Sequence, residues 1–423
     1  MHSSEVGTVH IIGAGLAGLA AAVRLVERGR SVVIHEATMQ PGGRCRSYFD
    51  QTAGMVIDNG THLVLSGNHA ALAYARTIGG IGGLDGPETA EFPFVDMSTG
   101  ARWTVQFNDS AIPWWIFDKK RRVPQTSVKD YLPLARLVWN SDDKPLSKVM
   151  NCNGPLYERL IAPFFLAALN VEPASGSARL AGALVRETLA KGGAACRPLL
   201  AREGVGTVFV DPAITFLQAR GAEILLQHEL HALRFSNRRV TELEFANDVI
   251  AMGANDYVIL AVPAYAAANL VPGLKTPSVF RGILNVHFRA DPPPGFPPMT
   301  GIINGTSEWL FAFPGRISVT ISDAAHMFSM PRDEVARTIW DEAAKVMGVS
   351  TPLPPWQIVR ERRATFAATP EENAKRPAAQ TRWPNLILAG DWTATGLPAT
   401  LESAIRSGNR AADLAGEGTR IAA

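Results

Sequence analysis

Short apolar runs alternate with a helical pattern at the start of the chain. Residues 8–12 (TVHII) form an apolar run, and residues 16–28 carry apolar positions at helical spacing until Gly29 ends the pattern. A second apolar run, SVVIH, covers residues 31–35. Strand, helix and strand in such quick succession predict a βαβ unit of a parallel sheet.

Strand patterns of the same kind return later in the chain. Residues 221–227, 240–245 and 257–262 predict strands in the middle, and Pro263 closes the last of them. Residues 385–389 (NLILA) predict one more strand, which is followed by a helical pattern over 400–414.

The stretches between these strands differ in character. Residues 79–86 are rich in glycine, and helical patterns follow from about 128 to 191. A proline-rich segment over 272–298 opens a second excursion, with a predicted strand at 318–322 and a predicted amphipathic helix at 334–347. The pattern favours an α/β fold in which a nucleotide-binding sheet is interrupted twice.

The predicted division has two parts. A Rossmann-type domain comprises residues 1–79, 204–266 and 375–423, and an interleaved α+β substrate-binding domain comprises residues 80–203 and 267–374. The chain of 423 residues is long enough for two such units.

Composition narrows the functional classes. Hydrophobic residues make up 47% and charged residues 19%, and the formal net charge is +2, so no strong field for nucleic acid is expected. The three cysteines (Cys45, Cys152 and Cys196) show no CxxC spacing, which argues against a disulfide framework or a metal site and fits a reducing cytoplasm. No uninterrupted apolar stretch of about twenty residues predicts a membrane-spanning helix.

The turn after the first strand matches the pattern GxGxxG. A first glycine permits the tight turn, a second lets a pyrophosphate approach the backbone, and a third lets the helix pack closely on the strand. Phosphates then lie at the helix N-terminus, where free N–H groups favour negative charge. The predicted contacts come from Gly13, Ala14, Gly15, Ala17 and Gly18.

Two further features bear on which dinucleotide is bound. Glu36 ends the second strand, where a carboxylate can accept hydrogen bonds from a ribose and repels a 2′-phosphate. Gly42, Gly43 and Arg44 follow, and an acid followed by GGR resembles the flavin enzymes of the amine oxidase and carotenoid desaturase type. The resemblance implies FAD, whose pyrophosphate the arginine can neutralise.

Residues 386–408 (LILAGDWTATGLPATLESAIRSG) resemble the C-terminal FAD signature of the flavin amine oxidase and phytoene desaturase superfamily. The resemblance implies that Gly390 and Asp391 contact the ribityl or pyrophosphate part, and that a helix starting near Thr400 and Leu401 points its N-terminus at the flavin. It also implies that adenine lies against the backbone of Leu230.

Residues 57–68 (IDNGTHLVLSGN) are similar to the block that follows GGR in plant-type carotenoid desaturases, and two shorter strings, residues 91–96 (EFPFVD) and 112–115 (IPWW), resemble the hydroxysqualene dehydroxylase family of bacterial hopanoid synthesis. The resemblance implies reduction of a C30 isoprenoid, in which an allylic hydroxyl is lost and a hydride from reduced FAD takes its place. The chain departs from the carotenoid desaturases at Glu402-Ser403-Ala404, where those enzymes usually show EGA.

Loss of the hydroxyl requires an acid, because hydroxide is a poor leaving group. Asp58 and His62 are the candidates for this role. In the alternative interpretation, Asp58 pins a turn and His62 is a packed core histidine.

The expected partners are an isoprenoid lipid and an unidentified electron donor, without nucleic acid. The aromatic and apolar residues of the inserted part belong to the hydrophobic core, line a lipid tunnel or surround a tunnel opening that faces the membrane. A basic run beside them is either a solvated surface or binds lipid headgroups. The protein is expected in the cytoplasm, either free or peripherally on the inner membrane. The residues concerned are Trp114, Trp115, Phe117, Pro163, Phe164, Phe165 and Leu166, with Lys119, Lys120, Arg121 and Arg122.

Two other functions use the same fold. An amine oxidase or carotenoid desaturase would run the redox chemistry in the opposite direction. A binder of prenylated proteins, similar to a GDP-dissociation inhibitor, would not be an enzyme, and the retained Glu36, Arg44 and Asp391 argue against it.

Overall fold

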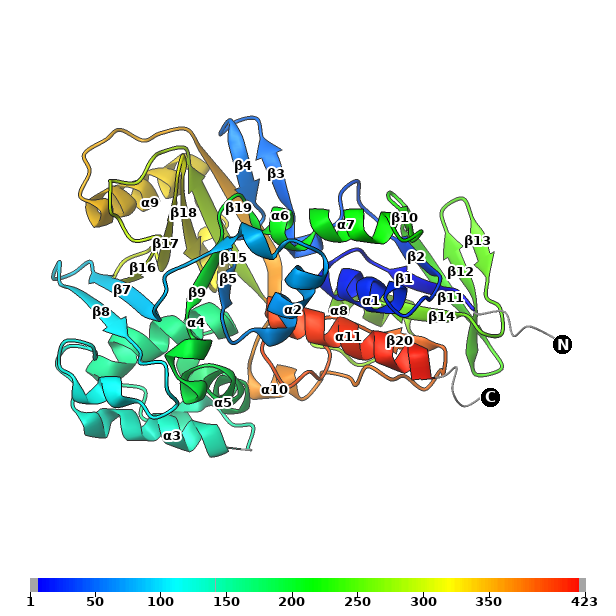
Figure 1. Cartoon of the computed structure of the whole chain (residues 1–423), viewed down its shortest axis with the longest axis horizontal. Coiled ribbons are helices and arrows are strands. Elements are labelled where there is room, and N and C mark those ends of the chain that lie inside the picture. The colour runs from blue at the N-terminus through cyan, green and yellow to red at the C-terminus, as the bar shows by residue number, and fades with distance from the viewer. Residues whose placement is uncertain (1–6, 141, 418–423) are drawn as a thin grey trace.

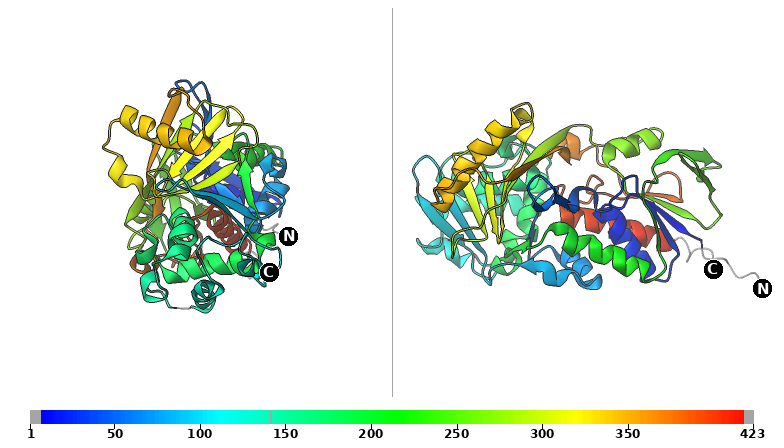
Figure 2. Two further views of the ribbon diagram at one scale, coloured as in Figure 1. Left: turned by 90° about the vertical axis from the view of Figure 1, so that its left-hand side faces the viewer. Right: turned by 90° about the horizontal axis from the view of Figure 1, so that it is seen from above.

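The computed structural model describes residues 7–140 and 142–417. The molecule is elongated, with a parallel sheet towards one end and a larger, mostly antiparallel sheet towards the other (Figures 1 and 2). Helices cover both sheets, and no helix of the described ranges is long and apolar enough to cross a membrane.

The parallel sheet has five strands in the order β10-β2-β1-β14-β20. Every neighbouring pair in it is parallel, and its strands are mostly buried, as expected for a sheet covered on both faces. This arrangement confirms the predicted α/β fold. The bounds are β1 (Val9–Ile12), β2 (Val32–His35), β10 (Glu223–Leu225), β14 (Tyr257–Leu260) and β20 (Leu386–Leu388).

Helices α1 (Leu16–Val26) and α11 (Leu401–Glu417) pack against each other beside this sheet (Figure 1). Small residues make the approach possible. A Cβ on Gly408 would lie 2.1 Å from the carbonyl oxygen of Ala17, so only glycine fits at this crossing. Helix α7 (Asp211–Gln218) also packs on α1.

A three-stranded meander of β11 (Leu230–Ser236), β12 (Arg239–Phe245) and β13 (Val249–Ala251) adjoins the parallel sheet. The side-chain amide of Asn385, just before β20, ties it down, accepting from Val240 N at 3.0 Å and donating to Val240 O at 2.9 Å. The meander therefore has a fixed position relative to β20.

The larger sheet has seven strands in the order β19-β15-β18-β17-β16-β7-β8, and only β16 and β7 pair in parallel. Helix α9 (Arg332–Met347) lies across one face of it (Figure 2). The strand at 280–288 was missed by sequence analysis, which assigned that stretch only a proline-rich character. The bounds are β7 (Glu91–Asp96), β8 (Arg102–Gln106), β15 (Phe280–Phe288), β16 (Met299–Ile303), β17 (Trp309–Phe313), β18 (Arg316–Ile321) and β19 (Trp356–Phe366).

Side chains of β15 alternate between the two faces of this sheet. Leu284, Val286 and Phe288 pack with α9 in one buried cluster, whereas Asn285 and His287 face the segment that follows β4. One face of the sheet is thus a structural core, and the other borders the predicted site.

Shorter elements connect these layers. The hairpin of β3 (Ser47–Asp50) and β4 (Met55–Asp58) stands out from the rest at the top of Figure 1. The remaining strands are β5 (Leu63–Leu65), β6 (Leu84–Asp85) and β9 (Pro198–Ala201), and the remaining helices are α2 (His69–Thr77), α3 (Leu132–Trp139), α4 (Ala162–Leu169), α5 (Ala178–Glu187), α6 (Val205–Phe209), α8 (Ala264–Leu270) and α10 (Pro370–Asn373).

The five strands of the parallel sheet come from three separate parts of the chain: residues 9–35, 223–260 and 386–388. The larger sheet takes its strands from residues 91–106 and 280–366. The proposed division of the chain into an FAD-binding and a substrate-binding domain stays a prediction.

We expect Gly408→Ala to destabilise the protein by about 1–3 kcal/mol, because the added methyl group forces α1 and α11 apart. Urea unfolding measures this change. Gly82→Ala is the matched control, since a Cβ on Gly82 meets nothing within 4 Å and the backbone there is not left-handed. Equal midpoints for the two variants would contradict the packing argument.

Candidate active site

The three glycines of the first turn have three different surroundings. Gly13 has a φ of +105°, and a Cβ on Gly18 would lie 2.0 Å from the carbonyl oxygen of Gly13. Gly15 has an ordinary φ of −73°, and a Cβ there would meet nothing within 4 Å. Gly13 and Gly18 therefore need to be glycine for the turn to fold, whereas the space beside Gly15 is open to a ligand.

Glu36 is buried beside this turn, with 8% of its surface exposed. Its Oε2 accepts from Ala14 N at 2.8 Å, and its Oε1 accepts from Thr38 N at 2.9 Å and from Thr38 Oγ1 at 2.8 Å. The carboxylate is held in one orientation, and Oε2 keeps capacity for a further hydrogen bond.

The start of β11 lies next to the same carboxylate. His228 N donates to the backbone oxygen of Glu36 at 2.8 Å, which places Leu230 two residues further along. The structure thus brings together the residues predicted for the ribose and for the adenine.

Three histidines line this region, and sequence analysis did not single them out. Nδ1 of His10 lies 3.1 Å from Nε2 of His35, and Nδ1 of His35 lies 2.9 Å from Nδ1 of His228. Burial, together with the neighbouring imidazoles, lowers the pKa of His35 to about 3, so its ring is neutral at pH 7. The three imidazole rings therefore add polar groups to this region, and the His35 ring among them carries no charge. Within residues 7–140 and 142–417 no cluster of His, Cys, Asp or Glu could hold a metal ion.

The GGR segment lies directly against the glycine turn. Gly42 N donates to the carbonyl oxygen of Ala14 at 2.8 Å, and a Cβ on Gly43 would lie 3.5 Å from Cα of Gly15. From here the guanidinium of Arg44 donates to Asp391 Oδ1 at 2.8 Å and to the carbonyl oxygen of Ala364 at 2.5 Å. The Arg44 side chain is still 40% exposed, and its contact with a pyrophosphate stays a prediction.

The loop after β20 is organised by a residue that sequence analysis missed. Arg376 is 7% exposed and donates to Leu397 O at 2.8 Å, to Asp391 O at 3.0 Å and to Thr395 Oγ1 at 2.8 Å. Burial lowers its pKa to about 10, and it remains charged at pH 7. Apart from Asn373, three residues earlier, its hydrogen-bond partners come from a segment further along the chain, so the surrounding sequence does not mark this arginine.

The N-terminus of α11 is capped as predicted for a helix that starts after Thr400. Ser403 N donates to Thr400 Oγ1 at 3.2 Å. The serine at the EGA position turns its hydroxyl inward, where Ser403 Oγ lies 2.7 Å from Thr395 Oγ1. The hydroxyl that distinguishes the chain from the desaturases therefore stabilises the loop after β20.

Glu402 joins α11 to another helix. Its carboxylate accepts from Ala70 N at 3.1 Å and from Ala71 N at 2.8 Å, at the start of α2, and Arg406 donates to it at 2.7 Å. A carboxylate at a helix N-terminus is favourable, since it meets unpaired N–H groups and the positive end of the dipole. The start of α11, with the predicted contacts Thr400 and Leu401, is therefore fixed to α2.

The two predicted catalytic residues have different surroundings. Asp58 is 2% exposed; its Oδ1 accepts from Ser47 Oγ at 2.6 Å and from Val205 N at 2.8 Å, and its Oδ2 lies 3.7 Å from Arg316 Nη2. Nδ1 of His62 lies 2.6 Å from the carbonyl oxygen of Gly60. The carboxylate thus caps α6, and the imidazole belongs to the loop that follows β4.

His62 is closer to the predicted flavin contacts. Its Nε2 lies 3.8 Å from Sγ of Cys45, the residue directly after Arg44. Burial lowers the pKa of His62, so the ring is neutral at pH 7. The roles of Asp58 and His62 in catalysis stay predictions.

The aromatic residues of the inserted part divide into two groups. Trp115 and Phe165 belong to the buried core, whereas Trp114 and Phe117 are each 60% exposed. On the inner side of the larger sheet, Phe92 and Phe94 pack with aromatic rings of neighbouring elements. The core interpretation therefore holds for some of these residues and not for Trp114 and Phe117.

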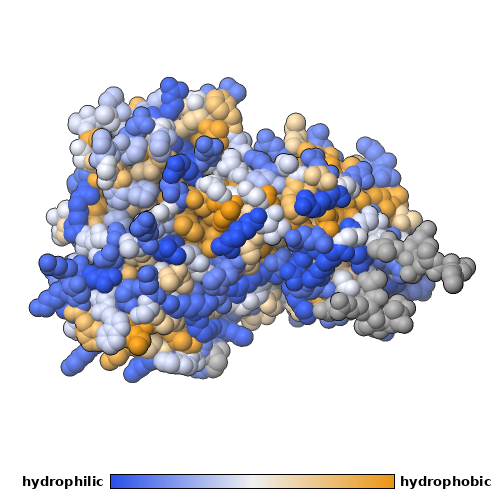
Figure 3. Space-filling view, in the orientation of Figure 1, coloured by the Kyte–Doolittle hydropathy of each residue, from blue (hydrophilic) through white to orange (hydrophobic). Residues whose placement is uncertain are grey.

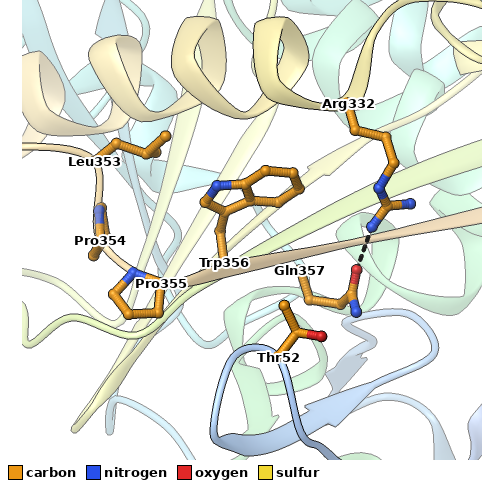
Figure 4. A pocket seen from close by; sticks show the side chains of 7 residues that line it. All are labelled: Thr52, Arg332, Leu353, Pro354, Pro355, Trp356 and Gln357. Carbon is orange, nitrogen blue, oxygen red and sulfur yellow. Dashed lines mark hydrogen bonds between the residues drawn. The ribbon is translucent and has the colours of Figure 1, made fainter.

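A surface pocket of about 650 Å³ lies between the β3–β4 hairpin, β19 and the start of α9 (Figure 4). Gln357 fills its polar side, accepting from Arg332 and donating to Asp50 Oδ2 at 2.7 Å. None of the predicted site residues lines it, so no function follows from this pocket. Its lining comprises Thr52, Arg332, Leu353, Pro354, Pro355, Trp356 and Gln357.

Residues 16–415 match the family described as flavin containing amine oxidoreductase. A hydroxysqualene dehydroxylase of Rhodopseudomonas palustris is 58% identical over 408 residues, which cover 96% of this chain and 98% of the relative. Hydroxysqualene dehydroxylases of Sinorhizobium fredii and Zymomonas mobilis are 56% and 45% identical, each over 96% of this chain and 98% of the relative.

Solved structures share the fold at much lower identity. Cyclohexylamine oxidase from Brevibacterium oxydans superposes with a TM-score of 0.72 at 15% identity, covering 98% of this chain and 99% of the other. A putrescine oxidase superposes with a TM-score of 0.71 at 18% identity, covering 99% of both chains. At these identities the likeness shows the fold alone.

We expect Gly15→Ala to fold normally and to bind FAD about tenfold or more weakly, because the added Cβ projects only into the space where the pyrophosphate approaches. Titration of FAD into the apoprotein, followed by flavin fluorescence, measures the affinity, and thermal unfolding of the apoprotein checks the fold. Gly82→Ala is the control for both. A Gly15→Ala protein with the affinity of the wild type would exclude a pyrophosphate at this position.

Proposed function

The chain belongs to the family of flavin-containing amine oxidoreductases, and we propose that within this family it is an FAD-dependent hydroxysqualene dehydroxylase, which converts hydroxysqualene to squalene. The observation that carries the proposal is the 58% identity to the enzyme of Rhodopseudomonas palustris over 96% of this chain. Identity of this extent covers both sheets and the segments between them.

The residues present fit an FAD molecule. Gly15 offers open space at a helix N-terminus, the GGR segment contacts the same turn through Gly42, and the loop after β20 is joined to the GGR segment by the Arg44–Asp391 pair. Glu36 and Leu230 would hold the adenosine end, Gly13 to Gly18 and Arg44 the pyrophosphate, and Gly390 to Leu401 the flavin end. When bound and reduced, FAD supplies the hydride that replaces the hydroxyl.

The protein's own residues have three tasks in this reaction. They hold an apolar chain, they exclude water from the reacting carbon, and they assist departure of the hydroxyl oxygen. The aromatic face around Phe92 and Phe94 suits the first two tasks.

We assign Asp58 and His62 different parts of the third task. Asp58 is a positioning residue that fixes the end of β4 to α6 through Val205. His62 is the catalytic candidate, because its ring lies beside Cys45 and therefore close to the predicted flavin. In the neutral ring the contact with the carbonyl oxygen of Gly60 places the proton on Nδ1, so His62 must take up a second proton on Nε2 before it donates one to the departing oxygen.

The function is tested with the reduced holoenzyme under anaerobic conditions. We expect that adding hydroxysqualene reoxidises the flavin and yields squalene in equal amount, as measured by the absorbance spectrum and by lipid extraction. A flavin that stays reduced beside intact hydroxysqualene would rule out the dehydroxylase. Oxygen consumption with an amine or a carotene precursor would then support the alternative, an oxidase or desaturase.

We also propose that the inserted part contacts the surface of an anionic membrane. The short helix Trp114–Phe117 and helix α3 expose large apolar side chains, and Lys119 and Lys120 are exposed directly after that short helix. Apolar surface is visible among hydrophilic atoms at the lower left of Figure 3, where Figure 1 places α3. Apolar side chains beside lysines suit the boundary between acyl chains and anionic headgroups. The exposed apolar residues are Ile112, Trp114, Phe117, Leu132 and Trp139.

We expect the double variant Trp114→Ser/Phe117→Ser to bind vesicles containing anionic lipid about tenfold more weakly, because it removes the apolar anchor, as measured by co-sedimentation. Val249→Thr is the control, because Val249 is 57% exposed on the distant meander. Binding that is equal in all three proteins, or that is absent from the wild type, would exclude the membrane contact.

A further inference from the structure

The inner face of β15 carries two fully buried polar side chains, those of Asn285 and His287. His287 has partners on both ring nitrogens: Nδ1 lies 2.8 Å from Ser318 Oγ and Nε2 lies 3.0 Å from the carbonyl oxygen of Asp58. Asn285, two residues earlier and 1% exposed, has partners at one end only. This difference between neighbours on one face needs a physical reason.

The orientation of the Asn285 amide is fixed by its oxygen. Oδ1 accepts from Thr320 Oγ1 at 2.7 Å and faces Thr61 N at 3.4 Å. Both are donors, so the carbonyl end must face them and the NH₂ end must face the other way. Nδ2 has no hydrogen-bond partner among the described residues, and neither does the buried hydroxyl of Thr61.

The free amide end points at a place where a side chain is missing. A Cβ built on Gly60 would lie 3.5 Å from Nδ2 of Asn285 and 3.6 Å from Cε1 of His62. The position above Gly60 therefore lies between an unpaired donor and the imidazole ring. That ring also contacts Cys45, which follows Arg44, the partner of Asp391, so this position adjoins the segments predicted to hold FAD.

We propose that Nδ2 of Asn285 and the hydroxyl of Thr61 bind the oxygen of the substrate, an allylic alcohol, at this position above Gly60. The proposal rests on the proposed function and deepens it. The amide donates to the alcohol oxygen, and the Thr61 hydroxyl donates to it or accepts from it. A site built to bond a hydroxyl discriminates against an analogue that lacks it, because buried polar groups are then left unpaired.

This assignment gives the amide two tasks. It places the carbon that bears the hydroxyl beside His62, and its N–H groups favour an oxygen on which negative charge develops as the bond to carbon breaks. The hydrocarbon product has no oxygen to occupy the position, so it binds more weakly than the substrate and leaves.

The experiment measures binding to the oxidised holoenzyme, in which no hydride is available. Hydroxysqualene and squalene are titrated separately, and the change in flavin absorbance reports their dissociation constants. We expect the wild type to prefer the alcohol, and Thr61→Val and Asn285→Leu each to reduce that preference about tenfold while leaving the affinity for squalene unchanged.

Thr61→Val is the sharper variant, because it removes only the unpaired hydroxyl. Asn285→Leu also removes the acceptor of Thr320, and its fold is checked by thermal unfolding. Thr300→Val is the matched control for Thr61→Val, because the hydroxyl of Thr300 is also buried and unpaired among the described residues. Thr300 belongs to the sheet that carries Asn285, but it lies on β16, three strands from β15. At the usual strand spacing this is about 14 Å away, and its alcohol preference is expected to equal that of the wild type.

Each outcome decides the proposal. If the wild type forms squalene but the preference of Thr61→Val is unchanged, the alcohol site is wrong and the dehydroxylase stands. If Asn285→Leu folds but loses FAD, the amide serves the cofactor and the alcohol site is again wrong. If the wild type neither prefers the alcohol nor forms squalene, the proposed function fails and the alcohol site fails with it.

Discussion

The ion pair of Arg44 and Asp391 is the contact on which the site depends. It joins two residues 347 positions apart, and the Asp391 side chain is only 7% exposed. A carboxylate this well buried needs a charged partner, because an unpaired buried charge is strongly destabilising. With the pair in place, the segment after β2 and the segment after β20 border the same space.

Other contacts hold the two partners of this pair. Gly42, next to the arginine, bonds the glycine turn through Ala14, and Arg376 bonds the backbone of Asp391. Glu402 adds a connection from α11 to α2. Each segment that we expect around FAD is thus held in place by polar groups that are paired within the protein.

The larger sheet has a different arrangement on each face. Towards α9 it is an apolar core, whereas towards β4 it carries the polar side chains of Asn285, His287, Ser318 and Thr320. His287 remains neutral, since burial lowers its pKa to about 4, and it bonds the backbone of Asp58. The only open capacity in this group is the amide nitrogen of Asn285. The sheet therefore supports the loop at 58–62 and offers one donor beside it.

The sequence by itself determined the cofactor class and much of the parallel sheet. The glycine turn, Glu36, the GGR segment and the string at 386–408 are local patterns, and their glycines are required by backbone conformations or close approaches within a short stretch of chain. Short family strings also led to the dehydroxylase assignment, which the high identity to the named relatives supports.

Only the tertiary structure decided the partners of Asp58, the bracing role of Arg376 and the half-paired state of Asn285. Each of these depends on groups far away in the chain: Val205 lies 147 positions from Asp58, and Thr61 lies 224 positions from Asn285. A local pattern records which residues a turn or a helix needs, whereas the pairing of a buried polar group depends on which distant segments the packed sheets bring beside it.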